Sequence, residues 1–306
     1  MFLVCGEALM DVFALGDTPT GVALDARVGG SPFNVAVGLA RLAQPVVFFG
    51  AVSKGFLGER LMRALSLEGV DLAHVARTDA PTTLSLVGLN AQGVPSYAFY
   101  GEGAADRQLS LDTLPPPTFS ALHVGSYTTV VEPVATTLRA LVEREHRRCL
   151  VAYDPNIRLN VQPELARWRD QLRWMLPRTH VLKISDEDLS LLLPQTSPAA
   201  FAADALAQGV QLVVVTRGGE GALAWTPHLH AAIAPTRVEV VDTVGAGDTF
   251  QAALLTWLAE HQALAAAQVG ALSAASLQDA LGFAAKAAAI TCSRRGADMP
   301  RRNELV

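Results

Sequence analysis

The stretch Asp242-Thr-Val-Gly-Ala-Gly-Asp-Thr-Phe250 is the part of the sequence from which the fold and the chemistry are best predicted. The valine-rich residues 238–241 before it predict a strand, and residues 250–260 after it predict a helix. Its glycines are therefore expected to join the two and to let the backbone approach a ligand closely. Free N–H groups at a helix start, at the positive end of the helix dipole, bind anions. The stretch predicts an anion site at a helix N-terminus.

Asp248 lies in the first turn of this expected helix, beside the predicted anion. A carboxylate next to an incoming hydroxyl group takes its proton while the oxygen attacks phosphorus. The alternative is that Asp248 merely caps the helix. The sequence contains no Gly-x-x-x-x-Gly-Lys-Ser/Thr motif, so a phosphate would not be bound by a P-loop.

Outward from this stretch, short apolar runs alternate with helical patterns. The expected strands are Phe2–Cys5, Val46–Phe49, Ala121–Val124, Leu150–Tyr153, His180–Ile184 and Gln211–Val215. The expected helices are Pro32–Leu42, Gly58–Leu67, Val134–Arg147, Pro163–Met175 and Pro198–Ala207. This alternation predicts an α/β fold, with a mostly parallel sheet covered by helices on both faces. Ligands of such sheets bind beyond the carboxyl ends of the strands.

Two stretches, about 12–28 and 82–101, break the alternation because they have β-type composition without a helix between their halves. The second predicts a hairpin whose loop is Asn90-Ala-Gln-Gly93. Together they predict a small antiparallel sheet that stands off the main body and serves as a lid or a dimer surface. The whole chain, residues 1–306, is expected to form a single domain with this appendage.

The composition narrows the class of protein. The chain has 306 residues, 50% of them hydrophobic and 17% charged, and a net charge of −5. Without clusters of Lys and Arg, binding to nucleic acid is not expected. Cys5, Cys149 and Cys292 are far apart and show no metal-ligand spacing, so a reduced, cytoplasmic protein is expected. The N-terminus lacks a basic region and predicts no signal peptide. The Ala-rich residues 263–290 predict buried helices and no membrane span.

A second motif is Gly29-Gly30-Ser31-Pro32-Phe33-Asn34. Ser31 before a proline predicts a helix N-cap with Pro at the first helical position. The glycine pair allows close backbone approach, and Asn34 offers hydrogen-bond donors and an acceptor, as a hydroxyl-rich ligand requires. The alternative is a structural turn and cap.

Three further motifs follow expected strands. Arg158, in Asp154-Pro-Asn-Ile-Arg158, would bind a phosphate or carboxylate, or form a surface ion pair. The acids of Lys183-Ile-Ser-Asp-Glu-Asp188 would hold Mg²⁺ near a triphosphate, or only begin a helix. Val215-Thr-Arg-Gly-Gly-Glu-Gly-Ala222 predicts a nucleotide contact or simply a hairpin turn. Because all three motifs follow strands, they are expected to converge at one edge of the sheet.

In this order, the motifs resemble those of the phosphofructokinase-B/ribokinase family of carbohydrate kinases, over nearly the whole chain. Residues 29–58 resemble the family's first signature, and residues 242–255 the second. The branch of bacterial fructokinases is the most similar, on the evidence of Gly6-Glu-Ala-Leu-Met-Asp11, Gly30–Asn34, Tyr97-Ala-Phe-Tyr100 and Lys183-Ile-Ser185. The resemblance implies a ribokinase-like three-layer αβα sandwich with a small β-sheet lid. It also implies an ATP-dependent transfer of a phosphoryl group to a sugar hydroxyl, with D-fructose as the expected acceptor.

The resemblance also implies roles for residues. The base would be Asp248, and the anion hole would be formed by the N–H groups of Gly245, Ala246 and Gly247. The sugar would contact Asp11, Gly29, Gly30, Asn34 and Arg158, with Tyr97 and Phe99 either on the sugar ring or packed in the lid. ATP would lie along Lys183, Ser185, Thr216, Gly218, Gly221 and Gly247. A monovalent cation such as K⁺ would be held near Asp242, Val244 and Gly296.

The sequence departs from the family pattern at the metal motif. The Asn-x-x-Glu that organises Mg²⁺ in the family is replaced by Ser185-Asp-Glu-Asp188, in which Asp188 has a shorter reach than Glu. Either Asp188 or Glu187 is therefore expected to organise Mg²⁺. Arg217 stands where the family often has a smaller residue, and it would face either the ATP phosphates or solvent.

Other acceptors remain open from the residues alone, namely 2-keto-3-deoxygluconate, ribose, another ketose or a nucleoside. A non-catalytic sugar or nucleotide sensor on the same fold is the alternative from another class. A protein that only binds its ligand has no need of a base such as Asp248, so the presence of this residue favours an enzyme over a sensor. A dinucleotide-binding oxidoreductase is disfavoured because no Gly-x-Gly-x-x-Gly follows the first strand. The partners expected are a sugar and a second copy of the chain paired through the lid.

Overall fold

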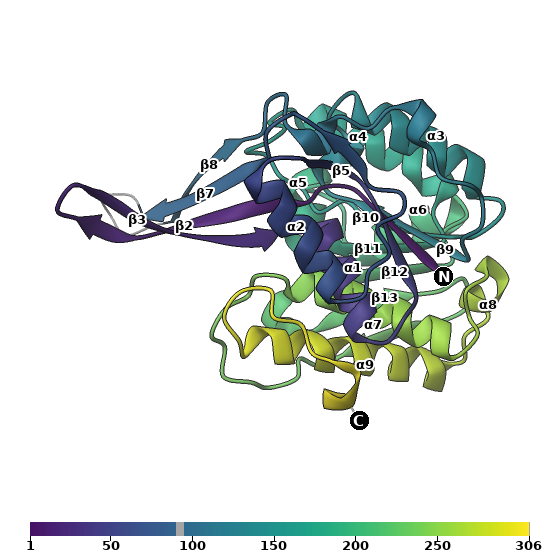
Figure 1. The fold of residues 1–306 in the computed structure, drawn as a ribbon. Helices are drawn as coiled ribbons and strands as arrows, with labels where there is room; N and C mark the ends of the chain where they lie inside the picture. The colour runs from purple at the N-terminus through teal and green to yellow at the C-terminus, as the bar shows by residue number, and fades with distance from the viewer. Residues whose placement is uncertain (90–94, 306) are drawn as a thin grey trace.

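The computed structural model describes residues 1–89 and 95–305, with residues 89 and 95–97 described by their backbone alone. The main body is a large sheet between two layers of helices, so the predicted αβα architecture is confirmed (Figure 1). In spatial order, the strands of this sheet are β14 (His230–Ile233), β13 (Ala222–Trp225), β12 (Leu212–Thr216), β11 (Val181–Ser185), β10 (Leu150–Asp154), β9 (Ala121–Gly125), β1 (Phe2–Cys5) and β4 (Val46–Phe49).

The strands from β12 to β4 are all parallel, whereas β13 and β14 run antiparallel at one side. Each expected strand of this parallel part agrees with the structure to within one residue at either end. The agreement is good because parallel strands buried on both faces are continuous apolar runs. The carboxyl ends of the parallel strands therefore meet at one edge, where the polar motifs follow them.

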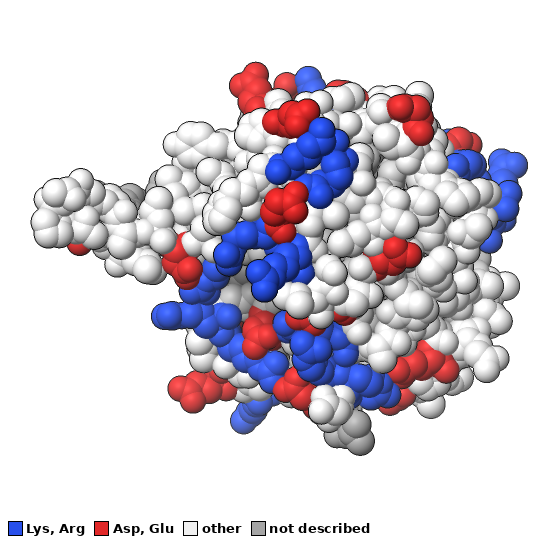
Figure 2. Space-filling view, in the orientation of Figure 1, with Lys and Arg blue, Asp and Glu red and all other residues white. Residues whose placement is uncertain are grey.

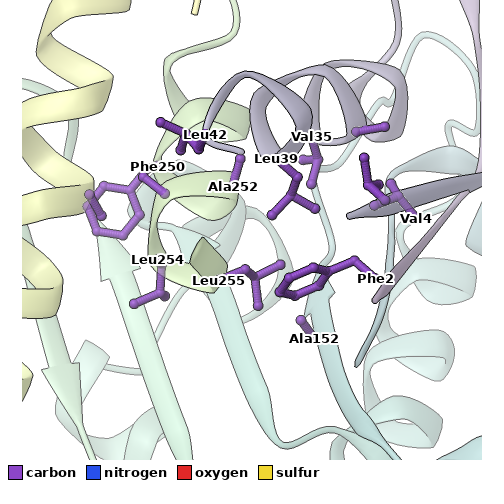
Figure 3. Packing of buried hydrophobic residues seen from close by; sticks show 14 of the residues in the cluster. Phe2, Val4, Val35, Leu39, Leu42, Ala152, Phe250, Ala252, Leu254 and Leu255 are labelled. Carbon is purple, nitrogen blue, oxygen red and sulfur yellow. The ribbon is translucent and has the colours of Figure 1, made fainter. Parts of the chain in front are cut away.

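Helices cover both faces of the sheet. One layer contains α1 (Ser31–Arg41), α2 (Phe56–Leu67), α7 (Ala246–Glu260), the short α8 (Ala266–Gly270) and α9 (Ala274–Cys292). The other contains α3 (Val134–Glu145), α4 (Leu165–Met175), α5 (Asp186–Leu192) and α6 (Pro198–Ala207). Figure 3 shows Phe2 and Ala152 of the sheet near Leu255 of α7 and Leu39 of α1. Because α7 lies between the sheet and α9, it is buried along nearly its whole length.

The second sheet projects from the main body (Figure 1). Its strands, in spatial order, are β3 (Gly21–Gly29), β2 (Leu9–Thr18), β7 (Leu84–Leu89) and β8 (Pro95–Tyr100). The pairs β2–β3 and β7–β8 are antiparallel, but β2 and β7 pair in parallel, so the prediction of a purely antiparallel sheet is wrong. The chain leaves the main body twice, first as β2 and then as β7, and these two strands lie side by side and run in the same direction. The predicted loop at residues 90–93 lies outside the described residues.

The strand predicted at residues 238–241 is wrong, because these residues are irregular. Val238, Val240 and Val241 are 37%, 62% and 60% exposed, so they lack an apolar surface on which a strand would pack. Instead, the backbone N–H groups of Val241 and Asp242 donate to the carbonyl of Cys292 at 2.8 and 3.2 Å. The turn before α7 is therefore held by the end of α9, and no strand leads into it.

Ion pairs fasten the C-terminal segment to the body. Arg41 of α1 bonds to both Asp298 and Glu68, at 2.8 and 2.7 Å, and Arg301 reaches Glu68 at 3.1 Å. Figure 2 shows Lys and Arg side chains interspersed with Asp and Glu on the face that carries α2.

Two further strands, β5 (Ala51–Ser53) and β6 (Ala76–Thr78), pair beside α2. Among the described residues, no helix has the length and apolar character needed to cross a membrane.

Candidate active site

A cavity of about 610 Å³ lies where the carboxyl edge of the main sheet meets the projecting sheet. The predicted site residues that line it are Asp11, Gly30, Asn34, Phe99, Arg158, Lys183, Glu187, Val244, Gly245, Gly247 and Asp248. The predicted site residues that do not line it are Gly29, Ser185, Asp188, Thr216, Gly218, Gly221, Asp242, Ala246 and Gly296. The side chain of Tyr97 lies outside the described residues. The cavity thus brings together most of the predicted acceptor and anion-site residues, whereas most of the predicted ATP contacts do not line it.

Asp248 projects from the first turn of α7 into the cavity. The helix is preceded by Gly245, whose φ of 77° is left-handed, and no side chain caps it. The carboxylate accepts hydrogen bonds from Ser31 Oγ at 2.6 Å and from Asn34 Nδ2 at 2.8 Å. The alternative that Asp248 is a helix cap is therefore wrong.

Burial raises the pKa of Asp248 above the ordinary value of an aspartate. The hydrogen bonds from Ser31 and Asn34 and the charge of Lys183 oppose this shift, and the charge of Asp154 adds to it. A carboxylate with a raised pKa accepts a proton more readily, provided that it stays ionised. The environment of Asp248 suits a general base.

Ser31 has a different role from the predicted one. It is the first residue of α1, the N-cap is Gly30, and no side chain caps the helix. The Ser31 hydroxyl is directed at Asp248 instead, because α1 and α7 pack together at their N-terminal ends. Gly30 has a φ of 107°, and a Cβ there would lie 2.8 Å from the carbonyl oxygen of Glu7. Only glycine leaves room for this approach.

Lys183 and Asp154 form a buried ion pair at the floor of the cavity. Lys183 Nζ lies 2.6 Å from Asp154 Oδ2, and both side chains are at most 5% exposed. The same Nζ lies 3.2 Å from the point that a Cβ on Gly247 would occupy. An ammonium group beside the positive end of a helix is unfavourable by itself. The arrangement is favourable when an anion binds between Lys183 and the first turn of α7.

Glu7 lines the cavity, and the sequence reasoning missed it. The residue lies two positions after the end of β1 and is 1% exposed, and Thr128 Oγ1 donates to its Oε2 at 3.0 Å. Burial raises the pKa of Glu7 to about 7, although hydrogen bonds from Ser126 and Thr128 oppose the shift. The signal that the sequence offered was its position just after a parallel strand, which is weak for a single acid. The other lining residues that were missed include Phe13, Ser85, Ser126, Asn156, Asn160 and Thr243.

We expect Glu7→Gln to change how stability depends on pH. The pKa of Glu7 is about 7 in the folded protein and near 4.5 in the unfolded chain, so ionisation favours unfolding. The wild type should lose roughly 2–3 kcal/mol relative to Glu7→Gln between about pH 5 and pH 8. Urea unfolding of both proteins across this range measures the difference. If the difference in the free energy of unfolding between the two proteins stayed constant over this pH range, Glu7 would not have a raised pKa.

Asp11 and Arg158 both line the cavity, Asp11 from β2 of the projecting sheet and Arg158 from the loop after β10. Burial raises the pKa of Asp11, and the charge of Arg158 opposes this. A Cβ on Gly29 would lie 2.3 Å from Asp11 Oδ2, so this glycine makes room for the carboxylate and does not itself line the cavity. Arg158 Nη1 donates to the carbonyl of Ile157 at 2.9 Å, which aligns its guanidinium at the cavity wall.

The residues predicted for ATP lie mainly at the ends of β11 and β12. Ser185 and Thr216 are partners in register across these strands. The hydroxyl of Ser185 caps α5 by accepting from the N–H of Asp188 at 3.0 Å. Gly218 and Gly221 belong to the turn of the β12–β13 hairpin, as one of the two interpretations of this motif predicts. A Cβ on Gly221 would lie 2.0 Å from the carbonyl oxygen of Ile233, so packing requires this glycine.

The two acids predicted to organise Mg²⁺ differ in whether they reach the cavity. Glu187 lines the cavity, whereas Asp188 turns away and accepts from the N–H of Ile157 at 3.3 Å. Burial raises the pKa of Asp188 to about 6. In the part of the chain that the structure describes, no three His, Cys, Asp or Glu residues form a metal-ligating group. The Asp242 carboxylate accepts from the N–H groups of Val244 and Gly296, and so joins the two loops beside α7.

Comparison with known proteins identifies the family. The sequence model of the family described as pfkB family carbohydrate kinase matches residues 1–303. The chain belongs to this family. A fructokinase from Rhizobium leguminosarum bv. trifolii is 36% identical over 281 residues, which are 91% of this chain and 86% of that protein.

Solved structures of pfkB-type fold agree with this assignment. The crystal structure of a fructokinase with bound ATP from Xylella fastidiosa has a TM-score of 0.89 and 29% identity, covering 99% of this chain and 96% of that one. The structure of a fructokinase from Vibrio cholerae O395 in a fructose, ADP and calcium ion bound form has a TM-score of 0.83 and 28% identity. It covers 99% of this chain and 97% of that one. The pfkB-family chain is therefore a sugar kinase, a transferase of phosphoryl groups.

Proposed function

We propose that this sugar kinase transfers the γ-phosphoryl group of ATP to a primary hydroxyl of D-fructose, giving fructose 6-phosphate. The observation that carries the proposal is the placement of the buried Asp248 between Ser31, Asn34 and the glycine turn of α7, inside a cavity large enough for a sugar. The names and bound molecules of the fructokinases described above support ATP and fructose as the two substrates.

The charges of the cavity favour a neutral acceptor. Among the described residues, the acids that line it are Glu7, Asp11, Glu187 and Asp248, and the bases are Arg158 and Lys183. Lys183 is already paired with Asp154, which leaves an excess of negative charge. The carboxylate of 2-keto-3-deoxygluconate would be repelled there, whereas carboxylates accept hydrogen bonds from the hydroxyls of a neutral sugar. In this proposal Asp11, Gly30, Asn34 and Arg158 hold the sugar.

Catalysis then relies on position and electrostatics. Asp248 orients the acceptor hydroxyl and takes its proton as the oxygen attacks phosphorus. The N–H groups of Gly245 and Gly247, together with the Lys183 ammonium, stabilise the charge that develops on the phosphoryl oxygens. The N–H of Ala246, which was also predicted for the anion hole, donates to the carbonyl of Thr243 at 3.2 Å instead. Phe13, Ser85 and Phe99 line the cavity from the projecting sheet, which we infer acts as a lid that excludes water.

Mg²⁺ fits this site through Glu187, because of the two acids predicted to organise the ion Glu187 lines the cavity and Asp188 does not. When bound, the ion would neutralise charge on the nucleotide phosphates. Glu187 would hold it through water, because Mg²⁺ usually keeps several of its own waters. Asp242 and the loop at Gly296 offer oxygen atoms for K⁺ beside the glycine turn, and their hydrogen bonds would let such an ion order the anion hole.

The test is the formation of ADP from ATP and Mg²⁺ in the presence of fructose, 2-keto-3-deoxygluconate, ribose and a nucleoside, with and without K⁺. We expect fructose to give the highest kcat/KM. A higher value for one of the other acceptors would replace fructose in the proposal. No sugar-dependent turnover would favour a sensor.

We expect two copies of the chain to pair through the projecting sheet. Leu15 on β2 and Val22 and Leu24 on β3 are 66%, 55% and 55% exposed there, and β3 is an edge strand of this sheet. Exposed apolar edges of this kind pair with another chain. Light scattering should show a dimer for the wild type and a monomer for Leu24→Glu. A monomeric wild type would contradict this expectation.

A further inference from the structure

Three buried polar side chains lie between α7 and the central sheet. His123 on β9 and Asp154 on β10 face α7, since Ala121 and Ala152 on the same faces of these strands belong to the core shared with α7. His123 is in register with Ala152, so Asp154 is its diagonal neighbour. Gln251 of α7 completes the group, with its Nε2 3.5 Å from His123 Nδ1.

Each of the three side chains has one atom without a partner. Within residues 1–89 and 95–305, His123 Nε2, Asp154 Oδ1 and Gln251 Oε1 make no hydrogen bond. The three residues are 1%, 2% and 0% exposed, so bulk water does not reach them. Buried polar atoms of this kind nearly always have a partner in folded proteins, often an ordered water.

The hydrogen-bond roles of these atoms are complementary. An amide nitrogen can only donate, so the contact between Gln251 Nε2 and His123 Nδ1 is a hydrogen bond in the tautomer that carries the imidazole proton on Nε2. We assign this tautomer to His123. Burial lowers the pKa of His123 to about 4, which keeps the ring neutral. Nε2 is thus a donor, while Asp154 Oδ1 and Gln251 Oε1 are acceptors. A water molecule accepts one bond and donates two, which satisfies all three atoms.

We propose that His123, Asp154 and Gln251 bind one interior water molecule, and that through it His123 positions the Asp154–Lys183 pair for phosphoryl transfer. The second part rests on the proposed function. His123 is a positioning residue, because it contacts Asp154 through the water and does not line the cavity.

The geometry explains why the water matters for turnover. Asp154 Oδ2 holds the Lys183 ammonium at 2.6 Å, while Oδ1 is the oxygen that the water would bind. With both oxygens bonded, the carboxylate keeps its orientation and the ammonium stays beside Gly247. Without the water, the carboxylate is free to rotate toward another partner and the ammonium moves with it. Displacements of about 1 Å in such groups cost up to about 100-fold in rate.

The test compares His123→Leu with His123→Gln. Leu removes the donor, whereas the amide nitrogen of Gln places a donor near the position of Nε2. We expect kcat of His123→Leu to fall roughly 10- to 100-fold while KM for the sugar stays within about twofold, and His123→Gln to recover most of the loss. Thr256→Val is the matched control, because Thr256 is a fully buried α7 residue whose Oγ1 also lacks a partner among the described residues.

Several outcomes would overturn the inference. Wild-type kcat in His123→Leu would do so, as would an equal loss in His123→Gln or in Thr256→Val. If His123→Leu does not fold, Gln251→Leu removes one acceptor of the same water and should lower kcat at constant KM. A high-resolution crystal structure of the wild type should show density bonded to all three atoms, and its absence would refute the water. An inactive wild type would instead refute the proposed function, without bearing on that density.

Discussion

Replacing Asp248 with Asn should lower kcat by on the order of 10²- to 10⁴-fold, the range for loss of a general base. The amide cannot take the proton of the acceptor hydroxyl, yet it fits the site. Its oxygen can accept from Asn34, and its nitrogen can donate to Ser31, whose hydroxyl also accepts. We therefore expect KM for the sugar to change little and the fold to be retained.

Steady-state kinetics of purified Asp248→Asn, with fructose and ATP varied in turn, measures both quantities. Asp204→Asn is a suitable control because Asp204 is an exposed acid on α6 that bonds only to the nearby Gln208 among the described residues. The base assignment fails if Asp248→Asn keeps a kcat within about twofold of the wild type. An equal loss in the control would point to a general effect on the protein.

The largest effect on stability is expected for Lys183→Met. The variant leaves Asp154 buried without its counter-charge, which typically costs about 3–5 kcal/mol. It also removes the ammonium group from the anion site, so kcat should fall by at least about 10²-fold. Urea unfolding gives the first quantity and kinetics the second.

A double variant separates the two effects. Lys183→Met combined with Asp154→Leu replaces the ion pair with apolar side chains, a change that is often neutral or stabilising in proteins. We expect the stability to return to within about 1 kcal/mol of the wild type or above it, while the activity stays low. If activity returned together with stability, Lys183 would have only a structural role.

The sequence predicted the central sheet well because its parallel strands are apolar on both faces and follow one another in order. It failed at residues 238–241, where three valines have the composition of a strand but no surface to cover. A local pattern cannot reveal whether a packing partner exists. It also missed the parallel pairing of β2 with β7, which depends on where two distant excursions of the chain meet.

The candidate site was predicted where a residue type and its place after a strand point to the same chemistry, as for Arg158, which follows β10. The sequence could not show that Ser31 bonds to Asp248, because this contact depends on how α1 packs on α7. Glu7 was missed because one acid after an apolar run carries little signal. The water-binding side chains His123 and Gln251 give no motif, since they matter only through neighbours in space.

The hydrogen bonds from Ser31 and Asn34 to Asp248 join residues 217 and 214 positions apart in the chain. During synthesis, Ser31 and Asn34 leave the ribosome long before Asp248, the proposed base, does. At about 5–20 residues per second, this delay is of the order of ten to forty seconds. In the proposed mechanism, a nascent or prematurely ended chain that lacks Asp248 has no base and would not transfer the phosphoryl group of ATP.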